Sequence, residues 1–256
     1  MTTRFSWKAL ALAFGISLSL LPPLALAQDS HAPHWGYSGK DGPADWGKLD
    51  SAFTSCSVGH AQSPIDIKGA KPADLPPLQF DYKAVSLTII DNGHTIQVNY
   101  PAGSTLTVGD KTYTLKQFHF HHPSEEHVNG KGYDLVAHLV HADAEGHLAV
   151  VAILFKAGSA NPFLDTIWKN IPATKEKVSD VPSVTINVKD LLPAGHGYFT
   201  FAGSLTIPPC SEGVTWYVLK SDAQLSSGQL DAFAKIYPLN ARPIQPTNNR
   251  QILETK

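Results

Sequence analysis

Apolar residues recur along the chain mostly in short runs, separated by turns rich in Gly, Asn, Asp and Pro. Such runs, enriched in β-branched and aromatic residues, predict strands. They cover residues 65–67, 87–90, 95–100, 106–108, 113–115, 117–121, 135–140, 148–155, 184–188, 198–205 and 214–219. The run at 148–155 is continuously apolar, which predicts a central strand buried on both faces.

Two hairpins are predicted between consecutive strands. Asn92-Gly93 separates the runs at 87–90 and 95–100, and Asn-Gly in that setting is the strongest short hairpin signal. Residues 109–111 form the turn of the second hairpin, which leads into a strand that contains several histidines.

Helices are expected at two places only, both late in the chain. Asn161 caps the first, with Pro162 at its first position. Ser226 or Ser227 caps the second, which ends before Pro238. Because crossover helices are lacking between the strands, a parallel α/β fold is excluded and a mainly β, mostly antiparallel fold is predicted.

The N-terminus has the pattern of a secretory signal peptide, residues 1–27. Arg4 and Lys8 precede an apolar run at 9–21, and Ala25-Leu26-Ala27 forms a small-x-small cleavage site. Pro22 and Pro23 cut the apolar run short of the ~20 residues that a membrane span needs. We therefore expect a periplasmic or secreted protein with no membrane association after cleavage.

Residues 28–256 are expected to form one domain, because no repeat or linker divides them. The full chain has a formal net charge of −2, and cleavage removes two basic and no acidic residues. The composition therefore lacks the basic footprint of a nucleic-acid-binding protein, and no nucleic-acid partner is expected.

Cys56 and Cys210 are the two cysteines of the chain. In an oxidising compartment we expect them to form one disulfide, the alternative being two buried free thiols. The bond would close a loop of about 155 residues, worth on the order of 5 kcal/mol at most by the chain-entropy argument. Cysteine is then an improbable metal ligand.

Six of the twelve histidines lie between residues 117 and 141. His119 and His121 share one face of a strand because side chains alternate with a period of two. If residues 135–140 pair with this strand, His138 meets them. Three imidazoles without a thiolate are the ligand set of a catalytic zinc site with an open fourth position. By spacing alone other histidines compete as ligands, namely His122, His127 and His141.

With these residues placed, the chain resembles an α-class carbonic anhydrase of the bacterial secreted type. The matching motifs follow the family's order and cover nearly all of the mature chain. They are residues 34–37, 62–65, 92–94, 117–121, 123–125, 137–141, 203–206, 208–216 and 240–246. The resemblance implies a central twisted sheet of about ten strands with a few short peripheral helices, and Zn²⁺ at the foot of a conical cleft.

The resemblance also implies a role for individual residues. It selects His119, His121 and His138 as the zinc ligands, and Gln117 as the partner of the first of them. Thr206 would accept a hydrogen bond from the zinc-bound hydroxide, and Glu125 would orient Thr206. His94, which by itself would be read as one more exposed turn histidine, becomes the proton shuttle.

The expected wall of the carbon dioxide pocket comprises Val140, Val150, Leu205, Val214 and Trp216. Cys56 and Cys210 match the family's disulfide.

Three positions leave questions open. Val136 stands where the family usually has a Glu that accepts the ring N–H of the third ligand, and the sequence alone leaves open whether Asp134 substitutes. Losing such a partner typically costs ~10–100-fold in metal affinity or activity. Ile207 stands where the family often has Thr, and we expect its apolar side chain to narrow the entrance of the active site. Glu126 competes with Glu125 for Thr206, although the ungapped spacing to His138 favours Glu125.

The leading hypothesis is a zinc enzyme that reversibly hydrates carbon dioxide to bicarbonate and a proton. Two alternatives remain. A related protein could keep the fold without turnover, which Val136 motivates and the intact His94 and Thr206 oppose. A zinc esterase is disfavoured by the small apolar pocket. The resemblance alone suggests a homodimer as one assembly.

Overall fold

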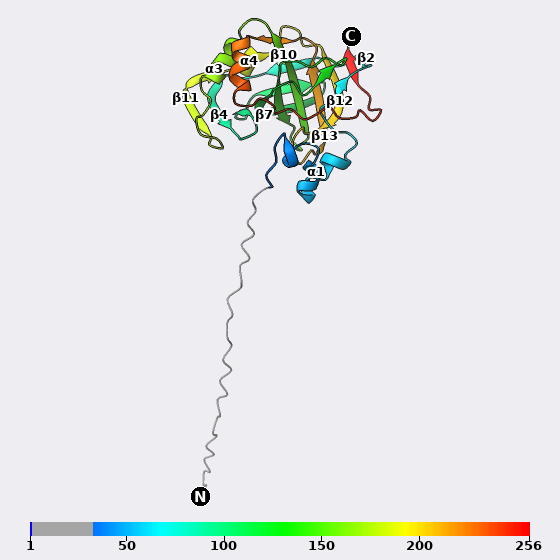
Figure 1. The fold of residues 1–256 in the computed structure, drawn as a ribbon, viewed down its shortest axis with the longest axis vertical. Helices are drawn as coiled ribbons and strands as arrows, with labels where there is room; N and C mark the ends of the chain where they lie inside the picture. The colour runs from blue at the N-terminus through cyan, green and yellow to red at the C-terminus, as the bar shows by residue number, and fades with distance from the viewer. Residues whose placement is uncertain (2–32) are drawn as a thin grey trace. The chain divides into compact units, whose positions relative to one another are not determined.

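One large β-sheet forms the centre of the fold in the computed structural model, which describes Met1 and residues 33–256. The expected signal peptide, residues 1–27, therefore falls outside the described part apart from Met1. The other described residues form a mainly β fold with a few short helices, and this confirms the predicted fold class (Figure 1).

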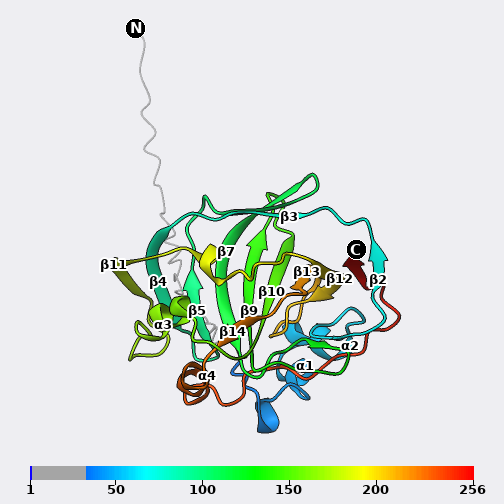
Figure 2. The ribbon, with the colours of Figure 1, turned by 90° about the horizontal axis from the view of Figure 1, so that it is seen from above.

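Ten strands follow one another across the sheet, as Figure 2 shows from β11 at one side to β2 at the other. In spatial order they are β11 (Ser179–Ile186), β4 (Val85–Asp91), β5 (Ile96–Asn99), β7 (Lys111–His121), β9 (Leu135–Ala142), β10 (Leu148–Ala157), β13 (Glu212–Leu219), β12 (Tyr198–Ser204), β15 (Leu253–Thr255) and β2 (Lys71–Ala73). Three more strands pair beside this path: β3 (Leu78–Asp81), β6 (Thr105–Val108) and β14 (Ala223–Leu225). A separate parallel pair joins β1 (Asp66–Ile67) to β8 (His127–Val128).

Most pairings in the large sheet are antiparallel, as expected. The exceptions among the described residues are β10 with β13, β10 with β14, and β15 with β2. Strand β10 is buried along most of its length, which confirms that it lies at the centre of the sheet. The two predicted hairpins also form, β4 with β5 and β6 with β7.

The two predicted helices are present and pack together. Helix α3 (Pro162–Trp168) is capped by the Asn161 side chain, and α4 (Ser227–Ala234) begins with a capping box at Ser226. Trp168 donates its ring N–H to the Gln229 carbonyl, which joins the helices.

The remaining helical turns are short, and sequence periodicity did not indicate them. They are η1 (Gly39–Asp41), α1 (Trp46–Leu49), η2 (Ser51–Phe53), α2 (Ser55–Val58) and η3 (Val188–Leu191). Within the described residues, no helix has the length and apolar character to cross a membrane.

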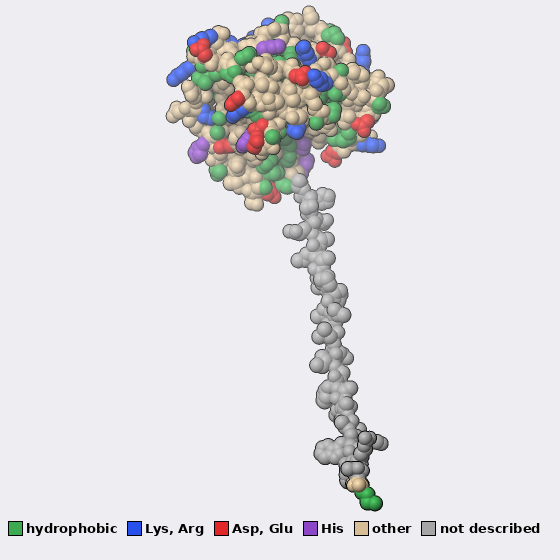
Figure 3. All heavy atoms as spheres, turned by 180° about the vertical axis from the view of Figure 1, so that it is seen from behind, with side chains coloured by type: hydrophobic (Ala, Val, Ile, Leu, Met, Phe, Trp, Pro, Cys, Tyr) green, Lys and Arg blue, Asp and Glu red, His purple; other side chains and the backbone are tan. Residues whose placement is uncertain are grey.

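The sheet separates two apolar clusters. One face of β7 contributes Phe118 and Phe120 to the larger cluster, which the two longer helices cover. On the other face a smaller cluster contains Val136, Val150 and Trp216. The histidines of β7 therefore share a face with the smaller cluster. On the side of the molecule drawn in Figure 3, basic and acidic side chains are interspersed over the surface.

The Cys56–Cys210 disulfide forms as expected and joins α2 to the loop after β12. Both cysteines pack against the buried Trp46. Arg242 strengthens the same junction, because its guanidinium donates to the carbonyls of Cys56 and Ser63 at 2.9 and 2.7 Å. The N-terminal helical turns are thus fixed to the sheet near Thr206.

We expect the C56S/C210S variant to lose about 2–5 kcal/mol of unfolding free energy, because the bond spans 154 residues and constrains the unfolded chain. Urea denaturation of oxidised wild type, reduced wild type and the variant measures this. Reduced wild type should match the variant, and coincident unfolding curves for all three would contradict the prediction.

Candidate metal centre

Adjacent antiparallel strands bring three histidines together. His119 of β7 lies directly opposite His138 of β9, and His121 lies two residues further along β7. Each offers one ring nitrogen to a group whose members all lie within 4.8 Å of one another. His121 and His138 are 1% exposed, whereas His119 is partly exposed, so solvent reaches the group from the His119 side only.

Each imidazole has its other nitrogen engaged in a hydrogen bond. His119 Nδ1 donates to Gln117 Oε1 at 2.8 Å, and His121 Nδ1 donates to the Asn240 carbonyl at 2.7 Å. His138 Nε2 donates to Glu126 Oε2 at 3.1 Å. The inward nitrogens, Nε2, Nε2 and Nδ1, are therefore the unprotonated ones in the neutral rings.

This donor set fits a zinc ion. His121 Nε2 is buried and has no hydrogen-bond partner among the described residues. Burial lowers the pKa of His119 to about 3 and that of His121 well below the usual range, with His138 adding to both effects. Burial also acts to lower the pKa of His138, but the charge and hydrogen bond of Glu126 raise it overall. Neutral imidazoles suit zinc and leave its charge uncompensated.

The competing histidines take other roles. His122 Nδ1 donates to the Asp134 carbonyl at 2.7 Å. His141 lies 2.8 Å from the Tyr82 hydroxyl, and burial lowers its pKa to about 4. Neither these two nor His127 belongs to a group with metal-ligand spacing in the described part of the chain.

Glu125, Glu126 and His138 form a second group within 4.8 Å, which shares His138 with the first. Carboxylates favour harder cations such as Mg²⁺ or Mn²⁺, whereas three imidazoles favour zinc. Because His138 Nε2 already donates to Glu126, the triple-histidine group is the better zinc site.

A cavity of about 80 Å³ opens beside the histidines. Its lining includes four of the five expected wall residues, namely Val140, Val150, Leu205 and Trp216, together with Ile207, which was expected at the entrance. Val214, the fifth expected wall residue, is buried in the smaller apolar cluster and does not line the cavity. Gln117 and Thr206 add polar atoms.

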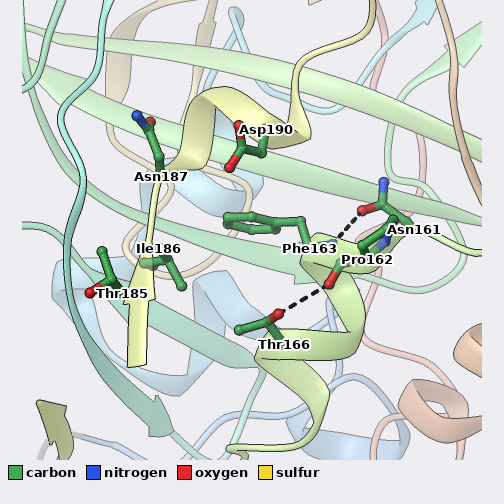
Figure 4. Close-up of a pocket in the computed structure, with 8 residues that line it drawn as sticks. All are labelled: Asn161, Pro162, Phe163, Thr166, Thr185, Ile186, Asn187 and Asp190. Carbon is green, nitrogen blue, oxygen red and sulfur yellow. Dashed lines mark hydrogen bonds between the residues drawn. The ribbon is translucent and has the colours of Figure 1, made fainter. Parts of the chain in front are cut away.

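A larger hollow of about 320 Å³ lies between α3 and the β11–η3 segment and shares no lining residue with the histidine cavity (Figure 4). Its polar side chains serve local structure. Asn161 accepts from the Phe163 amide, and Thr166 donates to the Pro162 carbonyl. No histidine lines this larger hollow, so of these two cavities only the smaller one has metal-ligating side chains.

Glu125 and Thr206 lie together near the three converging ring nitrogens. Glu125 Oε2 is 3.5 Å from His121 Nε2, and Oε1 accepts from the Arg242 amide at 2.8 Å. Burial raises the pKa of Glu125 to about 8, and the nearby His138, the Arg242 amide and the Thr206 hydroxyl act against this rise. The carboxylate beside Thr206 is thus Glu125, as the spacing favoured.

His94 lies in the turn between β4 and β5. The Asn92 side chain accepts from the amides of His94 and Thr95, which fixes the turn. The His94 ring stacks on Trp35 with centroids 3.7 Å apart, and burial, with the nearby His34, lowers its pKa.

Sequence reasoning gave no role to several residues that shape this site. Trp35, Asn240 and Arg242 lay in recognised motifs, yet their contacts with His94, His121 and Glu125 are long-range. Glu126 was noted only as a competitor of Glu125. No local pattern reports such contacts.

Comparison with known proteins now decides the family. A sequence model described as "Eukaryotic-type carbonic anhydrase" matches residues 41–256. The chain belongs to the carbonic anhydrase family. A carbonic anhydrase from Pectobacterium carotovorum is 45% identical over 228 residues, which cover 89% of this chain and 93% of that protein.

Solved carbonic anhydrase structures agree. A hyperthermostable carbonic anhydrase from a hydrothermal vent chimney superimposes with a TM-score of 0.84 at 43% identity, covering 87% of this chain and all of that one. The α-carbonic anhydrase from Thermovibrio ammonificans, solved with the inhibitor sulfanilamide, gives 0.83 at 41% identity, covering 86% and 99%. The chain is therefore an enzyme of this family, whose reaction is the hydration of carbon dioxide.

We expect wild-type protein to bind one Zn²⁺ per chain and H121A to lose stoichiometric binding, because only two converging imidazoles remain. At free zinc of about 1,000 times Kd, binding should stabilise the wild type by about 4 kcal/mol. Equilibrium dialysis and thermal unfolding measure both effects. H122A is the matched control, since His122 is adjacent but bonded to a backbone carbonyl; stoichiometric zinc in H121A would refute the site.

Proposed function

We propose that the protein is a zinc carbonic anhydrase in which His119, His121 and His138 hold the metal. The observation that supports this most strongly is the convergence of three ring nitrogens, two of which belong to histidines that line a mostly apolar cavity. Zinc in such a site supplies an activated water as a nucleophile at neutral pH.

The apolar wall suits the substrate. Carbon dioxide has no charge and offers few hydrogen-bonding groups, so it binds best against side chains such as Val140, Val150 and Trp216. A cavity of about 80 Å³ has room for a molecule of this size and too little for most esters. This supports hydration of carbon dioxide over ester hydrolysis as the main reaction.

Thr206 and Glu125 would orient the nucleophile. The positive charge of a bound zinc ion would lower the pKa of Glu125 and favour its ionised form. Thr206 would then donate its hydroxyl proton to this carboxylate, and its oxygen would keep only acceptor lone pairs for the cavity. The attacking oxygen must then direct its own proton to Thr206 and its lone pair to carbon dioxide. The Arg242 amide holds Glu125 in place for this role.

His94 would carry the released proton to the solvent. It is half-buried, so part of the residue remains accessible to solvent, where a buffer molecule can collect the proton. Its lowered pKa keeps the ring neutral near pH 7, and a neutral imidazole accepts a proton. Bicarbonate and buffer are then the other partners of the reaction.

We further propose that residues 1–27 are a signal peptide and that the mature domain, residues 28–256, works in the periplasm or outside the cell. The Cys56–Cys210 disulfide supports an oxidising compartment. A homodimer remains part of the proposal and is testable by sedimentation.

Stopped-flow hydration of carbon dioxide by the mature protein, with zinc measured on the same sample, tests the proposed function. We expect turnover far above the buffer rate, loss of activity when zinc is removed, and inhibition by sulfanilamide. Full zinc occupancy with a rate equal to buffer would instead identify a carbonic anhydrase-related protein without turnover.

In H94A we expect kcat to fall by roughly 10²-fold, the lower end of the contribution of a general acid–base group, with kcat/KM nearly unchanged. Added imidazole buffer should restore kcat, because it replaces the missing proton acceptor. In wild type, kcat should rise with pH through a midpoint below the usual histidine range, since the neutral ring is the accepting form.

H147A is the matched control for H94A, because His147 is an exposed histidine paired with Asp143. An unchanged kcat in H94A, or a loss that imidazole does not restore, would exclude His94 as the shuttle.

A further inference from the structure

The third histidine, His138, lacks a hydrogen-bond acceptor on its own strand. Val136 precedes it by two residues and faces the same side of β9, but its side chain is apolar and fully buried. An imidazole that ligates a metal almost always donates its other N–H to an acceptor. The acceptor must therefore come from another element.

Asp134 is engaged elsewhere. Its Oδ2 accepts from the Ala157 amide at 2.7 Å, at the end of β10. It thus ties two strands together, and its printed contacts do not include His138.

Glu126 supplies the acceptor from the loop between β7 and β8. Its Oε2 lies 3.1 Å from His138 Nε2, and the residue is 0% exposed. Its other oxygen has no partner among the described residues, so His138 is the single hydrogen-bonding partner of this buried carboxylate. A buried carboxylate is costly unless it is paired, which makes this contact a strong constraint on both groups.

The loop holds Glu126 in place through its backbone. Ser124 Oγ donates to the Glu126 carbonyl at 2.9 Å and accepts from the Tyr133 amide at 2.8 Å. The following residue, His127, bonds to the Ile65 carbonyl as β8 pairs with β1. The side chain is therefore presented to His138 from a backbone fixed on both sides.

The two adjacent glutamates address different edges of the same ring. Glu125 lies 3.8 Å from His138 Nδ1, the metal-facing nitrogen, whereas Glu126 contacts Nε2 on the opposite edge. Both glutamates lie in the irregular loop between β7 and β8, and this loop places the two consecutive carboxylates at both edges of the ring.

We propose that Glu126 is the positioning residue for the third zinc ligand, taking from the loop the role that Val136 cannot fill on β9; this rests on the proposed zinc function. Its carboxylate fixes the tautomer in which Nε2 is protonated, holds the ring in register with His119 and His121, and increases the basicity of Nδ1.

Zinc affinity, measured by competition with a chelator, tests this role. We expect E126Q, which keeps the shape but removes the charge, to bind zinc ~10–100-fold more weakly than wild type. D134N is the matched control and should stay within about twofold, because Asp134 bonds the Ala157 amide. Wild-type affinity in E126Q, or an equal loss in D134N, would overturn the proposal.

Relocating the carboxylate separates positioning from a merely structural role. In E126Q/V136E a carboxylate returns to β9 on the same face as His138, and zinc affinity should recover relative to E126Q. In NMR spectra of zinc-loaded protein with labelled histidine, the slowly exchanging His138 Nε2 proton should shift in E126Q and not in D134N. An unshifted proton would overturn the proposal.

E126D covers the case in which E126Q does not fold. It keeps the charge but withdraws the carboxylate by one methylene, beyond hydrogen-bond reach of Nε2, so weaker zinc binding is expected and unchanged binding would overturn the proposal. The proposed function fails separately: wild-type protein would then bind no zinc at the histidines, whatever the variants do.

Discussion

The register between β7 and β9 is the constraint on which the whole site depends. His119 faces His138 across the pair, and His121 faces Val136. A slip of one residue would turn the histidines of one strand toward the opposite, apolar face. Phe118 and Phe120 prevent such a slip, because it would expose their rings to the histidine side and remove them from the larger core. The apolar face of β7 thus sets the position of its polar face.

Buried charge is the second feature that organises the site. Glu125, Glu126 and Arg242 are all nearly inaccessible to solvent. Glu125 bonds to Arg242, 117 residues away, whereas Glu126 bonds to His138, 12 residues away. Arg242 bonds the carbonyls of Cys56 and Ser63, and its amide bonds Glu125. The C-terminal segment, the disulfide and the loop that contains Glu125 are therefore connected through one residue, Arg242. Such networks favour one arrangement, because a partly satisfied alternative would leave charges unpaired.

Much of this fold could be predicted from local patterns. The strand faces of His119 and His121, the Asn-Gly hairpin and the caps at Asn161 and Ser226 depend on neighbouring residues only. The parallel pairing of β10 with β13 could not be predicted, because it joins segments more than sixty residues apart. The hydrogen-bond partners of the three converging histidines could not be predicted for the same reason: His121 bonds to Asn240, 119 residues away. Glu126 is the clearest example of what the sequence could not predict. Its position in the sequence suggests only that it competes with Glu125 for Thr206, whereas the folded loop shows that it contacts His138.

The stacking of His94 on Trp35 has a practical consequence for attaching the protein to a support. Trp35 precedes the first helical turn, and its ring lies directly on the His94 imidazole. Lys256 follows β15, near the edge of the sheet formed by β2, and pairs with the exposed Asp74. A group attached beside Trp35 would crowd the solvent side of His94, whereas a linker at Lys256 would leave it open. Immobilised preparations should therefore be tethered through the C-terminus.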